Sequence, residues 1–216
     1  MLRALKNITY PRRKELIIAF CIWLGYTILA NLQYLPGPHQ LRILASIAQF
    51  FSELFRFFII LSPLGIAMLL IEVFKRKEIT MHSIAICLLT MSFSANHYIV
   101  APVFQFIAGE YTIRESEFLL RAIDQHKSDS GTYPDSLQQL VPKYIDNIRE
   151  PLIIDVIRYY WGNRDSAFSL SFQIEVEPYR YRHFVFRPDT TSTSEDQKVT
   201  YHRTTKQEWM YYEYDF

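Results

Sequence analysis

Three hydrophobic runs dominate the first half of the chain, at about residues 16–35, 55–74 and 79–101. A helix rises 1.5 Å per residue, so about 20 apolar residues are enough to cross the ~30 Å hydrocarbon core of a bilayer. Pro36-Gly37-Pro38 ends the first run, because proline and glycine break helices. The pattern therefore predicts three transmembrane helices.

Residues 39–56, between the first two runs, have a different pattern. Their apolar side chains recur at helical spacing, whereas polar residues occupy the remaining positions. The apolar positions are Leu44, Ile47, Ala48, Phe51, Leu54 and Phe55. We expect an amphipathic helix that lies along the membrane surface.

The second half of the chain, residues 110–216, has the pattern of a water-facing domain. A helix is expected over residues 110–127, with Phe118, Leu119, Ala122, Ile123 and His126 on one face. Strands are expected over 156–161, 166–176, 179–187, 198–203 and 208–214, with a turn at 162–165. Within 179–187, alternation places Tyr181, His183 and Val185 on one side and Arg180, Arg182, Phe184 and Phe186 on the other.

Together these patterns predict an α+β membrane protein with two domains. Residues 1–109 form a membrane domain with three transmembrane helices. Residues 110–216 form a small domain in which a helix packs on an antiparallel sheet.

A distinctive segment, GTYPDSLQQLVP, joins the expected helix to the expected sheet. Gly131 can take the positive φ that a helix-ending turn commonly needs. Proline restricts the residue before it, so Tyr133-Pro134 forms an extended step. Asp135 or Ser136 then caps a short helix, which Pro142 stops.

This segment resembles the globular half of type II secretion major pseudopilins and related type IV pilin-like domains. Those families carry a Gly-x-Tyr-Pro turn and a Ser-Leu-x-x-Leu short helix after a long helix. The matching residues here are Gly131, Tyr133, Pro134, Leu137 and Leu140. The resemblance covers about residues 118–160 and implies a pilin-like fold. No prepilin-processing site precedes the 79–101 run, and the families have one span where this pattern predicts three.

Charge divides the chain in the same way. Residues 1–109 carry ten Lys/Arg and four Asp/Glu. Residues 110–216 carry thirteen Lys/Arg and eighteen Asp/Glu. The acidic second half argues against a nucleic-acid surface, which needs clustered basic residues, so no nucleic-acid partner is expected. The positive-inside rule places the basic N-terminus and the 75–78 loop in the cytoplasm. We therefore expect a bacterial inner-membrane protein whose C-terminal domain lies in the periplasm.

The sequence contains none of the common catalytic motifs and only one candidate metal-binding loop. The two cysteines, Cys21 and Cys87, both lie in apolar runs, and no HExxH, P-loop, GxSxG or dinucleotide pattern occurs. Asp189, Glu195 and Asp196 in the polar 188–197 loop are candidate calcium ligands, and calcium sites occur in the similar pseudopilins. A solvated loop is the alternative reading. The sequence assigns no catalytic, cofactor or metal residue, so no enzyme is predicted.

Binding is the function that these patterns favour. Tyr, Trp and Arg dominate binding hot spots, and they crowd the last strands. The candidate partner surface comprises Arg180, Arg182, Trp209, Tyr211, Tyr212 and Tyr214. Aromatic residues also cover small sheets, so a core or edge role is the alternative. We expect a membrane-anchored protein, with the lipid bilayer as one partner, whose outer domain binds a protein or envelope component. An envelope enzyme and a subunit of a transport or secretion assembly are the alternatives.

Overall fold

The computed structural model describes most of the chain, namely residues 13–56, 62–74, 91–164, 167–177, 179–188, 200–206 and 208–215. It divides the chain into two compact units. One, the helical unit, comprises Met1–Leu32 and Ile43–Val103. The other, the sheet domain, comprises Gln33–Arg42 and Phe104–Phe216.

The helical unit contains α1 (Arg13–Ala30), α2 (Arg42–Arg56), α3 (Ser62–Phe74) and the π-helical turn η5 (Asn96–Val100). Its buried polar contact joins Asn31 to Asn96, where the Asn31 amide donates to the Asn96 side-chain oxygen at 2.9 Å. The helical reading of the amphipathic segment is confirmed, because α2 covers most of residues 39–56.

The prediction of three membrane-spanning helices is wrong for the helices that the structure describes. None of them is both long and apolar enough to cross a membrane. α1 has 18 residues but begins with Arg13, Lys14 and Glu15, so its uncharged part is only about 22 Å long. α3 has 13 residues and is about 20 Å long. Residues 57–61 and 75–90, parts of the second and third predicted runs, lie outside the described residues.

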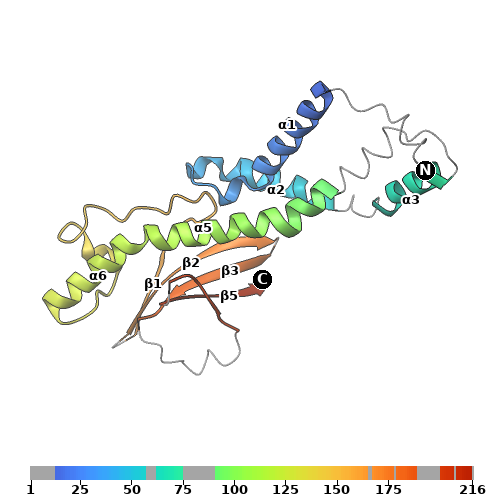
Figure 1. The fold of residues 1–216 in the computed structure, drawn as a ribbon. Helices are drawn as coiled ribbons and strands as arrows, with labels where there is room; N and C mark the ends of the chain where they lie inside the picture. Colours follow the sequence, from blue (N-terminus) through green and yellow to red (C-terminus); the bar gives the residue numbers. More distant parts are fainter. Residues whose placement is uncertain are drawn as a thin grey trace. The chain divides into compact units, whose positions relative to one another are not determined.

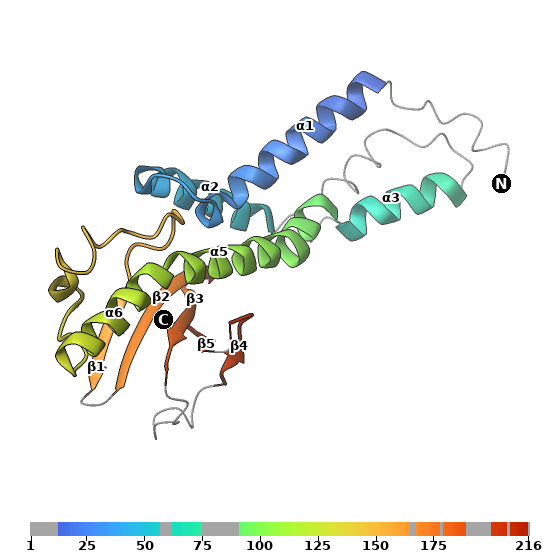
Figure 2. The same cartoon turned by 60° about the vertical axis from the view of Figure 1, so that its left-hand side comes forward.

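The sheet domain is an α+β fold in which α5 (Ala101–Glu115) and α6 (Glu117–Ser130) run along one face of an antiparallel sheet (Figure 1). The five strands have the order β1-β2-β3-β5-β4. They are β1 (Tyr160–Arg164), β2 (Ala167–Glu177), β3 (Arg180–Phe186), β4 (His202–Arg203) and β5 (Trp209–Asp215). Figure 2 shows the short β4 beside β5 at the edge of the sheet.

Alternation along β2 builds the core. Leu170, Phe172 and Ile174 are fully buried, and they share one hydrophobic cluster with Leu119 and Ile123 of α6. The helix expected over residues 110–127 is part of a longer helical stretch, formed by α5 and α6, that begins before residue 110 and ends after residue 127. The two helices meet at Ser116, whose hydroxyl donates to the Ile113 carbonyl at 2.7 Å. The predicted turn at 162–165 is displaced, because β1 continues to Arg164.

Gly109 allows the helix to approach the sheet closely. A Cβ at this position would lie 2.5 Å from Cζ of Phe184, which is closer than carbon atoms can approach. Phe184 itself stacks on Phe172, with ring centroids 4.8 Å apart. The absence of a side chain at Gly109 therefore fixes the spacing between α5 and β3.

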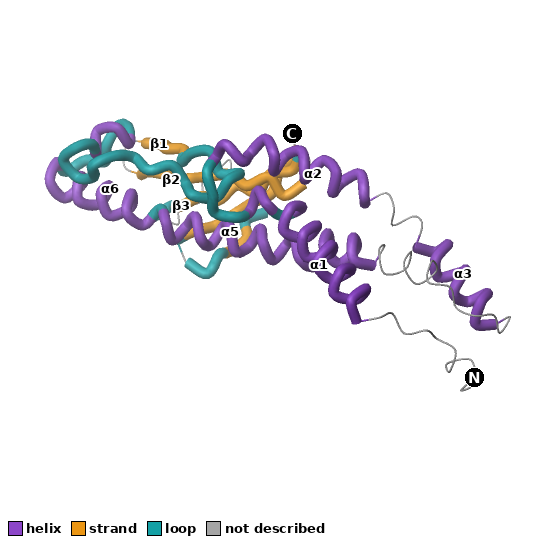
Figure 3. Tube along the Cα trace, turned by 90° about the horizontal axis from the view of Figure 1, so that it is seen from above, coloured by secondary structure: helices purple, strands orange, loops and turns teal. Residues whose placement is uncertain are grey.

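A segment from far earlier in the sequence completes the sheet domain. Residues 33–42, here named the strap, run antiparallel to residues 152–155. The Ile154 N–H donates to the Leu35 carbonyl at 3.1 Å, and the Gly37 N–H donates to the Leu152 carbonyl at 2.8 Å. Viewed from above, the loop that contains residues 152–155 runs from α6 back along α5 before it reaches β1 (Figure 3).

Candidate functional site

The turn after α6 contains the three predicted turn residues. Gly131 has φ of 78°, and its N–H donates to the Lys127 carbonyl at 2.8 Å, which ends α6. The Tyr133 ring lies 4.7 Å from the Phe168 ring, and Pro134 is buried. The short helix that follows is the 3-10 turn η6 (Leu137–Leu140). Gly131, Tyr133 and Pro134 thus connect α6 to the core.

The six residues of the predicted partner surface do not lie on one surface. Successive residues of a strand point to opposite faces, so Trp209 and Tyr211 face α5 and α6, while Tyr212 and Tyr214 face away. Trp209 is only 2% exposed, and its ring packs 5.5 Å from that of Phe172. Trp209 is therefore a core residue.

The two arginines of the predicted surface are held in ion pairs across β3 and β5. Arg182 contacts Glu213 at 2.6 Å, and its guanidinium lies 4.8 Å from the centre of the Tyr211 ring. Arg180 contacts Asp215 at 2.8 Å. Both arginines lie on the same side of the strands as Tyr211, so they are separated from Tyr212 and Tyr214.

The face of the sheet away from the helices carries a cluster that the structure assembles from two strands. We name it the tyrosine face: Tyr181 and His183 from β3, and Tyr212 and Tyr214 from β5. Tyr181 stacks on Tyr214 with centroids 5.9 Å apart, and His183 lies 5.1 Å from Tyr212. All four side chains are partly exposed. The alternation in the sequence places Tyr181 and His183 on one side of their strand, but it does not show that Tyr212 and Tyr214 lie beside them.

The tyrosine face is uncharged at neutral pH. Burial, with a smaller contribution from Arg187, lowers the pKa of His183 to about 4. Its Nδ1 lies 2.8 Å from the Tyr212 hydroxyl, which can donate to a neutral imidazole. The remaining nitrogen, Nε2, is buried and has no hydrogen-bond partner within the described residues.

One end of this face is shaped by a β-bulge between Glu175 and Glu177, where the register of β2 and β3 shifts. The Tyr34 hydroxyl of the strap donates to the Glu175 carbonyl at 2.9 Å. The Gln105 amide of α5 donates to the Val176 carbonyl at 3.0 Å and to the Tyr34 oxygen at 3.1 Å. The strap and α5 thus satisfy the carbonyl groups that the bulge removes from the strand pairing.

A hollow of about 210 Å³ lies beside the bulge and is lined by Arg42, Asp155, Glu175, Tyr181 and others. Asp155 is 8% exposed, and its carboxylate accepts a hydrogen bond from the Glu175 N–H at 2.6 Å. Burial raises the pKa of Asp155 to about 6, and the nearby Glu175 carboxylate adds to the rise. This carboxyl group therefore keeps its proton to a higher pH than an exposed aspartate does.

The described residues contain no cluster of metal-binding side chains. Among them, no group of three or more His, Cys, Asp or Glu side chains is arranged to hold a metal ion. The candidate calcium ligands Asp189, Glu195 and Asp196 lie outside the described residues, as does Cys87. The calcium hypothesis for this loop stays a prediction.

Comparison with protein-family models, with curated proteins and with solved structures finds no match for this chain. The resemblance to pilin-like domains therefore stays a prediction, carried by Gly131, Tyr133, Pro134 and the short helix after them.

Proposed function

We propose that the sheet domain is a binding domain for a protein partner and that the tyrosine face is its contact surface. Tyrosine combines a large apolar ring with a hydroxyl, and such residues contribute strongly to protein interfaces. Three tyrosines and one histidine from two adjacent strands present such a surface in a single patch. This clustering is the observation that carries the proposal.

The rigidity of the patch supports the same proposal. β3 and β5 pair along seven residues, from Arg180 opposite Asp215 to Phe186 opposite Trp209. Rings that are held on paired strands and stacked on one another lose little conformational entropy when a partner binds.

The charge of the patch favours a protein over a nucleic acid. His183 is neutral at pH 7, and none of the four residues of the tyrosine face carries a positive charge there. Nucleic-acid surfaces take most of their affinity from Lys and Arg contacts with phosphate. The nearby Arg180 and Arg182 are already paired with carboxylates.

The test compares Tyr212→Ser and Tyr214→Ser, combined in the full chain, with Tyr98→Ser as a matched control. Tyr98 is 64% exposed and belongs to the helical unit. We expect a protein to co-purify with the parent chain and to be absent from the double variant, whose thermal unfolding stays close to that of the parent. The control keeps the partner. A folded double variant that retains the partner contradicts the proposal, as does turnover of a substrate by the purified protein.

A further inference from the structure

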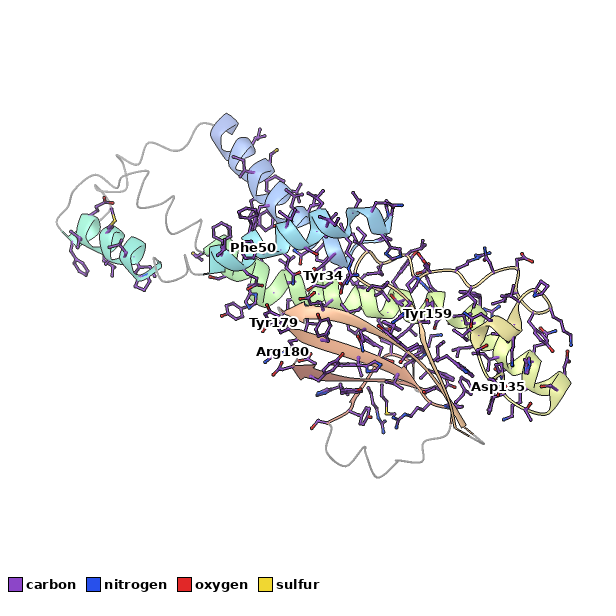
Figure 4. All side chains as sticks on the ribbon, turned by 180° about the vertical axis from the view of Figure 1, so that it is seen from behind. Tyr34, Phe50, Asp135, Tyr159, Tyr179 and Arg180 are labelled. Carbon is purple, nitrogen blue, oxygen red and sulfur yellow. The ribbon has the colours of Figure 1, made fainter. Side chains whose placement is uncertain are left out.

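In the part of the chain that the structure describes, the helical unit exposes large apolar side chains and turns small and polar ones inward. On α2, the exposed apolar side chains are Ile43, Leu44, Ile47, Phe50, Phe51 and Leu54. Phe50, which is labelled in Figure 4, is 61% exposed. The opposite side of α2 carries Ala45, which is 2% exposed, and the partly buried Ser52. A helix on the surface of a water-soluble domain has the reverse arrangement, with its apolar side packed inward.

Polar side chains join the helices of this unit. The Tyr26 hydroxyl of α1 lies 3.0 Å from the Ser52 hydroxyl of α2. The Asn31 amide, directly after α1, donates to the Asn96 side-chain oxygen of η5, and both asparagines are buried. Lipid acyl chains are as apolar as leucine, so helices in lipid are joined by hydrogen bonds and by small residues at their contacts. The inward side of the helical unit therefore has the composition of a helix contact in lipid.

The exposed apolar side chains of α1 cover too wide an arc for one partner helix. They are Ile17, Phe20, Ile22, Leu24, Ile28 and Leu29. At 3.6 residues per turn, these positions spread over about 200°, which is more than half of the circumference of the helix. A helix that packs on one neighbour needs an apolar stripe of about 100°. Acyl chains, in contrast, surround every exposed side of a helix at once.

The charges of this part of the chain fit an anionic lipid surface. Residues 1–56 carry seven Lys/Arg and two Asp/Glu, which gives a net charge of +5. The sequence from Leu16 to Leu41 contains no Lys, Arg, Asp or Glu, so the basic residues lie at the ends of this stretch. Arg13 and Lys14 begin α1, and Arg42 begins α2. Basic side chains in such positions reach phosphate headgroups while their apolar neighbours enter the acyl chains.

We propose that the apolar sides of α1 and α2 lie in an anionic lipid bilayer, at the boundary between its headgroups and its acyl chains. Helices bind there without crossing the bilayer, and none of the described helices is long and apolar enough to cross it. The surface position expected from the sequence for residues 39–56 thus extends to α1. Acyl chains, rather than a second copy of this chain, cover the apolar surface. The binding does not depend on the tyrosine face, which belongs to the sheet domain.

The experiment measures how brominated lipids quench tryptophan fluorescence in the full chain. The vesicles contain equimolar phosphatidylcholine and phosphatidylglycerol, with bromine on the acyl chains. Phe50→Trp is compared with Ile157→Trp, because Ile157 is 49% exposed and lies in the sheet domain. We expect brominated vesicles, but not ordinary ones, to quench the emission that Phe50→Trp adds, and to leave the emission that Ile157→Trp adds unchanged. Absence of quenching at position 50, or equal quenching at both positions, overturns the proposal.

Polar substitutions then test what this surface contributes to binding. Ile47→Gln combined with Phe51→Gln should lower the vesicle partition coefficient at least about tenfold, because two inserted apolar side chains are lost. Leu152→Gln combined with Ile157→Gln is the matched control, since these two side chains of the sheet domain are exposed to a similar extent. The control should bind as the parent does. An unchanged partition coefficient in the folded α2 variant overturns the proposal, as does a parent chain that stays off the vesicles and dimerises through this surface.

Discussion

Replacing Asp155 by Asn should change how the stability of the sheet domain depends on pH. The pKa of Asp155 is raised from 3.8 to about 6 by burial. The folded state therefore holds this proton more tightly than the unfolded state does. The resulting stabilisation is present below about pH 4 and is lost as pH rises through about 6. A rise of this size in the pKa of Asp155 corresponds to a contribution of about 3 kcal/mol to the free energy of unfolding.

His183 acts in the opposite direction over the same range. Its pKa is lowered from 6.5 to about 4, so the folded state favours the neutral ring. Its contribution is present above pH 6.5 and is lost as pH falls towards 4. If His183 were fully buried, its pKa shift would contribute about 3 kcal/mol to the free energy of unfolding. Because the ring is partly exposed, solvent screening reduces this contribution to about 2 kcal/mol. The contributions of Asp155 and His183 therefore oppose each other between pH 4 and 7.

Single variants separate the two contributions. An Asn at position 155 keeps an oxygen that can accept the Glu175 N–H, but it cannot ionise. We expect the stability of Asp155→Asn relative to the parent to rise by about 3 kcal/mol from pH 4 to pH 7. Urea unfolding followed by tryptophan fluorescence at several pH values measures this difference. Other titrating groups, including Glu175, are present in both proteins.

The control variant His183→Gln should show the opposite trend, losing stability relative to the parent as pH rises. A stability difference between Asp155→Asn and the parent that stays constant from pH 4 to 7 would contradict a raised pKa of Asp155. It would mean that Asp155 is as accessible to water in the folded state as in the unfolded state.

Substitutions at Gly131, Gly109 and Tyr34, with Gly25→Ala as a control, test the packing by urea unfolding. Gly131→Val should destabilise the protein by about 1–2 kcal/mol and Gly131→Asn by less, because φ at Gly131 is positive and no other atom crowds the site. If Gly131→Val were as stable as the parent, the positive φ at this turn would be contradicted. Gly109→Ala should destabilise the protein by about 1–3 kcal/mol, because the added methyl group clashes with Phe184. Gly25→Ala, in open space on α1, should stabilise it by up to about 1 kcal/mol. The same effect at both sites would contradict the close approach of α5 to β3. Tyr34→Phe should cost about 1–3 kcal/mol by removing the hydroxyl that bonds the β-bulge, and an unchanged midpoint would show that the strap contact is absent in solution.

Local patterns in the sequence predicted much of the sheet domain. The alternation of β2 and β3 follows directly from side-chain direction, and Gly131 ends α6 in the conformation that its position suggests. The same alternation separates Trp209 and Tyr211 from Tyr212 and Tyr214. In β5 this alternation places Trp209 on the core side, so the sequence carries a signal for its burial.

Other features left no local signal. The strap meets residues 152–155 across more than 100 positions of sequence, and the Tyr34 hydroxyl reaches a carbonyl 141 residues away. Such pairings depend on tertiary structure and produce no periodicity. The three membrane spans were predicted from counts of apolar residues, which do not show where a helix ends; α1 stops at Ala30 and α3 has only 13 residues. The periplasmic location and the lipid bilayer as a partner stay predictions.

The most direct test of the proposed function is site-resolved photo-crosslinking in cells that produce the full chain. A photoreactive side chain is placed in turn at Tyr212 and Tyr214 on the tyrosine face and at the exposed Arg121 on α6. We expect positions 212 and 214 both to crosslink to one and the same protein, and position 121 not to crosslink to it. Equal crosslinking from all three positions, or none from 212 and 214 while 121 reacts, would contradict it.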